Sequence, residues 1–217
     1  MLAVSALSRH PQMMAGSEDA ESPKRRAILN AATELFAARG YGAVSMDAIA
    51  RAADVSKATL YAHFESKDRL FATIVHVACL ENIMPADDLP EDGALDMASL
   101  GEVLRTIGGR ILRFFLLDRS LAIHRLVIAE SVRFPELGRA FYDNGPVAGR
   151  QRLAAWMASQ PALDVPDPEV AAEQFLGLLR SGLYLRATLG LAPAPDAAAI
   201  EAVVAAAVGT FLRAYRA

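Results

Sequence analysis

Apolar residues recur along most of this chain at intervals of three and four residues, which is the spacing of one face of an α-helix. In the segment from Pro23 to Gly40 this apolar stripe consists of Ile28, Ala31, Ala32, Leu35 and Phe36. Gly40 closes the pattern, as glycine commonly does just after a helix. The β-branched residues are scattered and do not alternate with polar ones, so the chain is predicted to be all-α, without a sheet.

Two short amphipathic segments follow between residues 45 and 64. The first has apolar side chains at i, i+3, i+4 and i+7, namely Met46, Ile49, Ala50 and Ala53. Asp54-Val55 interrupts this pattern, and Ser56 is placed to cap a second helix directly after it. In that helix Leu60 and Phe64 are four residues apart, so they share its buried face. Two short helices joined by a tight turn predict a helix-turn-helix DNA-binding motif.

Ser66 is placed to cap a fourth helix that holds Leu70, Phe71, Ile74, Val75 and Ala78. Further helical patterns lie at about residues 98–117, 119–133, 136–144, 146–160, 168–189 and 196–214. They are separated by Asp118, Pro135, Gly145-Pro146 and two proline-containing runs. Pro85–Asp96 contains two prolines and five acidic residues, which predicts a solvated loop. Residues 1–22 show no periodicity and predict a flexible arm. We therefore expect an arm of residues 1–22, a DNA-binding domain of residues 23–70 and a helical domain of residues 71–217.

The composition indicates the cellular location of the protein more clearly than its activity. The net charge is −3, but residues 22–70 hold 8 Lys and Arg against 5 Asp and Glu, a small excess that agrees with DNA binding without proving it. Cys79 has no partner for an internal disulfide, and no Cys/His cluster has metal-ligand spacing. No run reaches the ~18 uninterrupted apolar residues of a membrane span, and Met1–Leu7 is a poor signal peptide. We expect a cytoplasmic protein without metal, cofactor or membrane partner.

The last two predicted helices carry wide apolar stripes. The candidate dimer-interface residues on them are Phe175, Leu179, Gly182, Leu183, Arg186, Val203, Val204, Ala207 and Phe211. Both stripes can equally pack inward within a monomer, and the sequence leaves that alternative open. A helix-turn-helix protein generally needs a partner to read a palindrome, which favours a homodimer.

The N-terminal segment resembles the TetR family of bacterial one-component regulators over residues 24–72. The matching series is Arg26-Ala27-Ile28-Leu29, Ala32, Leu35-Phe36, Gly40-Tyr41, Ser45, Ile49-Ala50, Ala53-Asp54-Val55-Ser56, Thr59-Leu60-Tyr61, His63-Phe64, Ser66-Lys67 and Leu70-Phe71. Arg125–Ser131, Phe134–Leu137 and Phe141-Tyr142 are similar to a subgroup with AcrR- or AefR-type C-terminal domains. The family often has glycine where this chain has Asp54, in a turn where positive φ is common, and Asp tolerates that conformation better than most residues.

The resemblance implies that the second helix of the motif lies in the major groove of operator DNA. Lys57, Ala58 and Thr59 lie near its N-terminus, where Lys57 and Thr59 are placed to reach base edges. The candidate phosphate contacts are Ser45, Tyr61, His63 and Lys67, with Lys24, Arg25 and Arg26 adding charge at the start of the first helix. Taken singly these residues have simpler explanations, since serines cap helices, tyrosines pack, and Lys-Arg-Arg runs are usually solvated.

The resemblance also implies an N-terminal three-helix DNA-binding domain joined through a fourth helix to a C-terminal ligand-binding and dimerisation domain. A small-molecule effector would bind in the second domain and push on the fourth helix, releasing a repressor from DNA. Candidate pocket residues are Phe114, Phe115, His124, Arg125, Phe141, Tyr142, Trp156 and Phe175. Aromatic and polar groups on helices can line an apolar cavity, but such residues also form ordinary cores. The composition indicates an apolar or amphipathic ligand.

Two other classes of function remain possible at this point. A small helical enzyme is disfavoured, because the sequence has no Gly-rich phosphate loop, no nucleophile elbow and no metal-ligand cluster. A helical protein-interaction module without DNA binding is the second alternative. Salt-dependent DNA binding separates it from a regulator.

Overall fold

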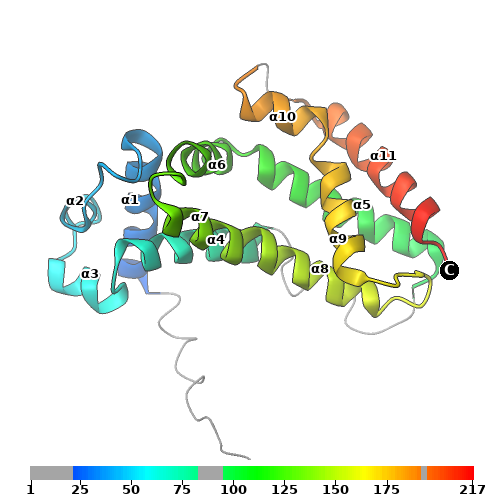
Figure 1. Cartoon of the computed structure of the whole chain (residues 1–217), viewed down its shortest axis with the longest axis horizontal. Coiled ribbons are helices and arrows are strands. Elements are labelled where there is room, and N and C mark those ends of the chain that lie inside the picture. Colours follow the sequence, from blue (N-terminus) through cyan, green and yellow to red (C-terminus); the bar gives the residue numbers. More distant parts are fainter. Residues whose placement is uncertain (1–21, 83–94, 192–194) are drawn as a thin grey trace, which may run out of the picture.

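The computed structural model describes residues 22–82, 95–191 and 195–217, and it consists of helices (Figure 1). Their bounds are α1 Pro23–Arg39, α2 Met46–Ala52, α3 Lys57–His63, α4 Lys67–Asn82, α5 Met97–Leu116, α6 Asp118–Glu130, α7 Pro135–Tyr142, α8 Ala148–Ala158, α9 Pro168–Leu179, α10 Gly182–Thr188 and α11 Ala197–Tyr215. No strand is present within these ranges, and Leu163 and Arg216 form an isolated β-bridge. The prediction of an all-α fold is confirmed. The predicted arm and most of the predicted acidic loop lie outside the described residues.

The predicted helix caps are present where polar side chains precede an apolar stripe. The Ser45 hydroxyl accepts a hydrogen bond from the Ala48 amide at 3.2 Å, and the Ser56 hydroxyl accepts one from the Thr59 amide at 3.0 Å. Asp96 caps α5 in the same way through the Ser99 amide at 2.8 Å. Each cap satisfies a backbone N–H that has no partner inside the helix, so the starts of α2, α3 and α5 are fixed locally.

Two hydrophobic cores lie at opposite ends of the molecule. The first is built around three aromatic side chains, Phe36, Tyr41 and Phe71, whose ring centres are 5.3–5.9 Å apart. It joins α1–α4 to Ile123, Leu126, Val127 and Leu137 of α6 and α7. The N-terminal core is therefore completed by segments from the middle of the chain.

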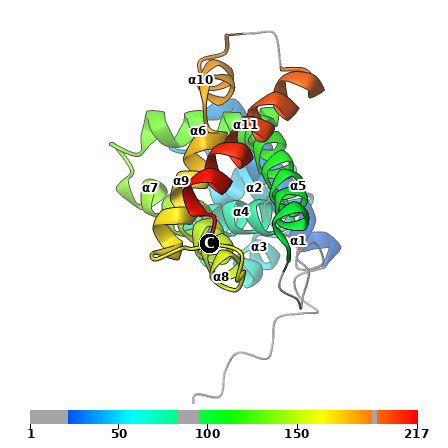
Figure 2. The same ribbon diagram turned by 90° about the vertical axis from the view of Figure 1, so that its right-hand side faces the viewer.

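The second core lies among α5, α8, α9 and α11. Figure 2 shows α11 against α5 and α9, and the buried residues of α11 are Ile200, Val204, Ala207, Val208 and Phe211. An added Cβ at Gly108 would lie 3.3 Å from Phe175, Leu179 and Val204, so glycine allows α5 to approach both helices closely. Figure 1 shows α4 and the α7–α8 segment running between the two ends of the molecule.

Two predicted helix boundaries are wrong. Gly145-Pro146 does not end a helix, because Asp143–Val147 forms a π-helical turn that continues from α7 directly into α8. A π turn contains one extra residue, which accommodates a proline that an α-helix would exclude. Conversely, the predicted helix over residues 168–189 breaks at Arg180 and Ser181, giving α9 and α10. Both halves keep a helical apolar pattern, so the periodicity alone did not mark the break.

Candidate functional site

The helix-turn-helix motif is formed by α2 and α3. Asp54 lies in the turn between them with φ 53°, so it adopts the left-handed conformation that the sequence analysis expected it to tolerate. The Val55 amide then donates to the Ala50 carbonyl at 3.0 Å, which closes the turn. Leu60 and Phe64 point into the N-terminal core, 0% and 4% exposed. The opposite face of α3 is consequently turned to solvent.

The solvent-facing side of α3 carries the side chains predicted to contact DNA. Lys57 and Ala58 are exposed, and Tyr61 is 44% exposed. The Lys57 ammonium lies 2.9 Å from the Asp47 carboxylate, and this hydrogen-bonded partner raises the Lys57 pKa. Thr59 is half-buried and shares a 2.8 Å hydrogen bond with the Ser56 hydroxyl. To contact a base or a phosphate, Lys57 has to give up its ion pair with Asp47. This ion pair is exposed and contributes little to stability.

The remaining predicted DNA contacts have different surroundings. Lys24, Arg26 and Ser45 are exposed, whereas Arg25 and His63 are half-buried. The Arg25 guanidinium lies 5.4 Å from the centre of the Phe64 ring. Arg25 and Arg26 also line a cavity described below. The start of α1 thus faces both the DNA-binding motif and the cavity.

Lys67 differs from the prediction of a surface phosphate contact. Its ammonium donates to the carbonyls of Tyr41 at 2.8 Å and Val44 at 3.0 Å, and it lies 4.2 Å from the centre of the Tyr41 ring. Burial lowers the Lys67 pKa. The Tyr41 hydroxyl in turn donates to Asp68, and burial, followed by this contact, raises the Tyr41 pKa. Lys67 therefore holds the segment between α1 and α2 against the start of α4.

Glu130, which sequence reasoning missed, binds the same segment from the other side. Its two carboxylate oxygens accept hydrogen bonds from the backbone amides of Tyr41 and Gly42, both at 2.9 Å. Gly40 has φ 80°, and a Cβ there would lie 2.4 Å from the Glu130 carboxylate. The last residue of α6 thereby fixes the position of the α1–α2 connection, close to the DNA-binding motif.

A cavity of about 790 Å³ lies behind the motif. It is lined by α1, α4, α5, α6, the α7–α8 segment, α9 and α10, through Arg25, Arg26, Leu29, Asn30, Thr33, Ile74, Val75, Val77, Ala78, Phe114, Phe115, Arg119, Ser120, Ile123, His124, Phe141, Gly145, Pro146, Gly149, Leu176, Arg180 and Tyr184. Its volume is in the range of small-molecule sites. α4 begins directly after α3 and also lines the cavity, so one helix connects the motif with the cavity.

Four of the predicted pocket residues line this cavity, and four do not. Phe114, Phe115, His124 and Phe141 line it. Trp156 and Phe175 are buried in the C-terminal core instead, where the Phe175 ring packs against Phe211 of α11. Arg125 binds the carbonyls of Ala187 and Thr188 at the end of α10, and Tyr142 is 53% exposed.

The polar groups among the cavity's aromatic rings are His124 and Tyr184. The Tyr184 hydroxyl and the His124 Nδ1 are 2.9 Å apart, and Phe115 and Phe141 lie 5.6 Å and 5.8 Å from these rings. Burial, followed by the nearby charge of Arg180, lowers the His124 pKa, and burial raises the Tyr184 pKa. Both shifts favour the uncharged forms at neutral pH. This part of the cavity is an aromatic wall with neutral hydrogen-bonding groups.

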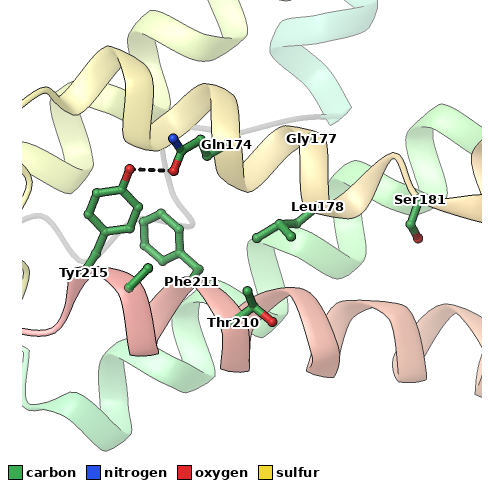
Figure 3. A pocket seen from close by; sticks show the side chains of 8 residues that line it. Gln174, Gly177, Leu178, Ser181, Thr210, Phe211 and Tyr215 are labelled. Carbon is green, nitrogen blue, oxygen red and sulfur yellow. Dashed lines mark hydrogen bonds between the residues drawn. The ribbon is translucent and has the colours of Figure 1, made fainter.

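A groove of about 480 Å³ runs between α9 and α11 on the outer surface (Figure 3). Gln174, Leu178 and Ser181 line it from the side of α9, and Thr210 and Tyr215 line it from α11. The Tyr215 hydroxyl donates to the Gln174 side chain at 2.7 Å. The groove exposes the outer faces of the two helices that were predicted to dimerise.

The predicted dimer-interface residues lie mostly on the other face of these helices. The ones buried in the chain's own core are Phe175, Leu179, Val204, Ala207 and Phe211. They pack in the core formed with α5, and Phe211 also lines the groove between α9 and α11. Gly182 and Arg186 are exposed, and Leu183 and Val203 are half-buried. The buried apolar residues of α9 and α11 therefore pack inward within the chain, as the monomer alternative expects. The outer faces of the two helices form the groove.

α11 is also long enough and apolar enough to cross a membrane, with a mean hydropathy of 1.6. Among the described helices only α11 has this length and composition, and core helices of other proteins share them. One side of α11 packs on α5 and α9.

An exposed recognition helix on an all-α fold, joined by one helix to an internal cavity, defines a DNA-binding transcriptional regulator. The sequence matches the model of bacterial regulatory proteins of the tetR family over residues 28–74. Residues 102–217, more than half of the chain, match the AefR-like transcriptional repressor C-terminal domain. The chain belongs to the TetR family of transcriptional regulators.

Individual relatives agree with this assignment. The solved structure of the flavonoid-responsive regulator FrrA is 40% identical, with a TM-score of 0.70 over 89% of this chain and 97% of that one. A TetR regulator from Agrobacterium tumefaciens is 28% identical, with a TM-score of 0.73 over 90% and 95%. UidR of Escherichia coli (strain K12) is 41% identical over 63 residues, 29% of this chain. That match spans about a third, 32%, of UidR.

Proposed function

We propose that this protein is a cytoplasmic, non-enzymatic repressor that binds a palindromic operator as a homodimer and is released by a small amphipathic ligand. The observation that carries the proposal is the position of α4, which starts beside the recognition helix and lines the cavity with Ile74, Val75 and Ala78. A ligand that displaces this helix changes the spacing of the two recognition helices, which the groove repeat of about 34 Å constrains. The proposed division of the domains at residues 70 and 71 falls within α4, so this helix belongs to both.

The proposed base contacts are Lys57, Ala58 and Thr59, at the exposed start of α3. Their position supports the role, since recognition helices of this class use their N-terminal residues to contact base edges. Ser45, Tyr61 and His63 are proposed to contact phosphates, and Lys24, Arg25 and Arg26 are proposed to add positive charge toward the DNA at the start of α1. Lys67 is reassigned to holding the α1–α2 connection, because two of its ammonium protons are directed at carbonyls.

The proposed dimer forms through the outer faces of α9 and α11. Small and apolar side chains along the groove support this assignment, among them half-buried Leu178 and exposed Thr210 and Ala214. Two grooved helix pairs that pack against each other form a four-helix interface, which keeps two DNA-binding motifs on one side of the dimer. This arrangement suits a palindrome.

The proposed ligand is planar and aromatic. The rings of Phe115, Phe141 and Tyr184 around His124 support stacking with such a ligand, and neutral His124 and Tyr184 provide hydrogen bonds to a hydroxyl or carbonyl group. The structural relative FrrA is named for its response to flavonoids, which agrees with this class of ligand.

The test of DNA binding uses a duplex from the region upstream of the protein's own gene, titrated at increasing salt. We expect affinity to fall steeply with salt, because phosphate contacts release counterions. Lys57→Ala is expected to cost about 1–3 kcal/mol on this duplex and less on a scrambled one. The control is Arg139→Ala, because Arg139 is exposed on α7, outside α2 and α3. Absence of a complex at low salt, or an equal loss in the control, would contradict the proposal.

A further inference from the structure

The charges around the cavity have one sign. Four arginines line it, and no Asp or Glu among the described residues does. These arginines are Arg25, Arg26, Arg119 and Arg180. They come from α1, from the start of α6 and from the break between α9 and α10. Because like charges that share one cavity repel each other, this arrangement is unfavourable unless a counter-ion is present.

None of the four arginines forms an ion pair with a described residue. Elsewhere arginines do so: Arg105 binds Glu102, and Arg150 binds Glu169, both at 2.6 Å. Two of the cavity arginines rest on rings, since the Arg180 guanidinium lies 4.7 Å from the centre of Phe115 and Arg25 lies over Phe64. The remaining two, Arg26 and Arg119, have exposed side chains with no hydrogen bond to the described residues. Their guanidinium donors remain available.

The two cavity arginines without a partner among the described residues differ in exposure from the polar groups among the rings. Arg26 and Arg119 are exposed and therefore lie at its mouth, whereas His124 and Tyr184 are half-buried among the aromatic rings. The pKa shifts of these two residues favour their neutral forms, so the inner part carries hydrogen-bonding groups without charge. The cavity thus has neutral hydrogen-bonding groups among its aromatic rings, with Arg180 lying over Phe115, and two guanidinium groups, unpaired among the described residues, at its mouth.

We propose that the ligand carries an acidic group, a carboxylate, sulfonate or ionised phenol, which Arg26 and Arg119 bind at the mouth while its aromatic body lies inside. The inference rests on the proposed function, because it takes this cavity as the effector site. Guanidinium groups bind planar anions through paired, charge-assisted hydrogen bonds, which makes arginine the suitable residue for such a group. A neutral ligand of the same shape leaves the four charges uncompensated.

The proposed contact has a consequence for regulation, because Arg26 belongs to α1 of the DNA-binding segment. Arg26 is also one of the residues predicted to add positive charge toward DNA at the start of α1. An acidic ligand and the DNA backbone therefore compete for the same guanidinium, in addition to any movement of α4. Ligand binding and DNA binding then oppose each other through a shared residue.

The experiment compares two fluorescent probes that share an anilinonaphthalene body: 8-anilinonaphthalene-1-sulfonate, which is anionic, and N-phenyl-1-naphthylamine, which is neutral. Arg26→Gln and Arg119→Gln are titrated with both probes in the folded full-length protein, checked by circular dichroism. Each substitution is expected to weaken binding of the sulfonate by about tenfold and to leave the neutral probe unchanged. Arg139→Gln, which removes an exposed charge outside the cavity, is expected to change neither.

Equal changes for both probes, or none for either, would overturn the acidic-ligand proposal while leaving the cavity as a binding site. Failure of both probes to bind the wild-type protein would overturn the proposed effector site itself. Displacement of the bound sulfonate probe is then compared for 2-naphthoate and inorganic phosphate at equal concentration. Displacement by 2-naphthoate supports the proposal, and equally effective displacement by phosphate refutes it, because the arginines would then bind anions without an aromatic body.

Discussion

Replacing Glu130 with glutamine tests whether the end of α6 stabilises the DNA-binding motif. Glu130→Gln keeps the shape of the side chain but replaces one acceptor oxygen with an NH₂ group, which faces the amide of Tyr41 or Gly42. Each hydrogen bond to a charged group contributes roughly 1.5–3 kcal/mol. Since the Gly42 amide is exposed and the Tyr41 amide is half-buried, we take the lower part of that range and expect a total loss of about 2 kcal/mol.

For a protein of this size, a loss of about 2 kcal/mol lowers the melting temperature by about 4–8 °C. The assay is urea and thermal unfolding followed by circular dichroism, at one fixed protein concentration because the proposed dimerisation would contribute to apparent stability. Amide hydrogen exchange adds a local measurement, with faster exchange expected at Tyr41 and Gly42.

The matched control is Glu34→Gln, because Glu34 is exposed on α1 without an ion pair or hydrogen bond to the described residues. We expect this control to change stability by less than about 0.5 kcal/mol, as surface substitutions usually do. If Glu130→Gln and Glu34→Gln have the same stability, or if exchange at Tyr41 and Gly42 is unchanged, the assignment of Glu130 as a link between the two parts of the chain is refuted.

Three further predictions concern the turn, the cavity and the groove. Asp54→Ala is expected to be about 1–2 kcal/mol less stable than Asp54→Gly in urea unfolding, because only glycine adopts a positive φ without strain, and equal stabilities would contradict this. Because burial and Arg180 lower the pKa of His124, the unfolded state binds more protons below about pH 6.5. The free energy of unfolding is therefore expected to fall as the pH drops from 7.5 through this value, and to level off below the pKa of the folded state. His124→Asn leaves the neighbouring Tyr184 in place and is expected to remove this pH dependence. If the variant keeps the pH profile of the wild-type protein, His124 is not its cause. Thr210→Arg is expected to produce a folded monomer that binds operator DNA weakly in size-exclusion and binding assays, and an intact dimer would exclude the groove as the interface.

The elements of the fold that could be predicted from sequence are those set by neighbouring residues. Ser45 and Ser56 cap α2 and α3 because a hydroxyl three residues before an amide can reach it directly. Asp54 adopts positive φ for a reason contained in its own side chain. The break at Arg180 was missed, since both α9 and α10 retain helical periodicity.

The candidate sites were less predictable, because they depend on contacts between distant residues. Glu130 binds amides that lie 88 and 89 residues earlier in the sequence, and no local pattern marks it. Phe175 was assigned to both the pocket and the dimer interface, and it belongs to the core. An aromatic residue on a helix that is apolar on two sides gives no indication of which neighbour it faces. Arginines at the start of α1 and α6 form one group only after folding.

The π turn at Asp143–Val147 makes chain length in this segment a structural requirement. Leu137 packs in the N-terminal core before the turn, and Leu153 packs in the C-terminal core after it. Each residue of an α-helix advances the side-chain direction by about 100°. If these five residues adopted regular α-helical geometry, the buried side of α8 would rotate by roughly 100° out of its core, and the wider π turn absorbs that extra residue. A further single-residue insertion, which a loop would tolerate, is therefore expected to be excluded from this Asp-Asn-Gly-Pro segment.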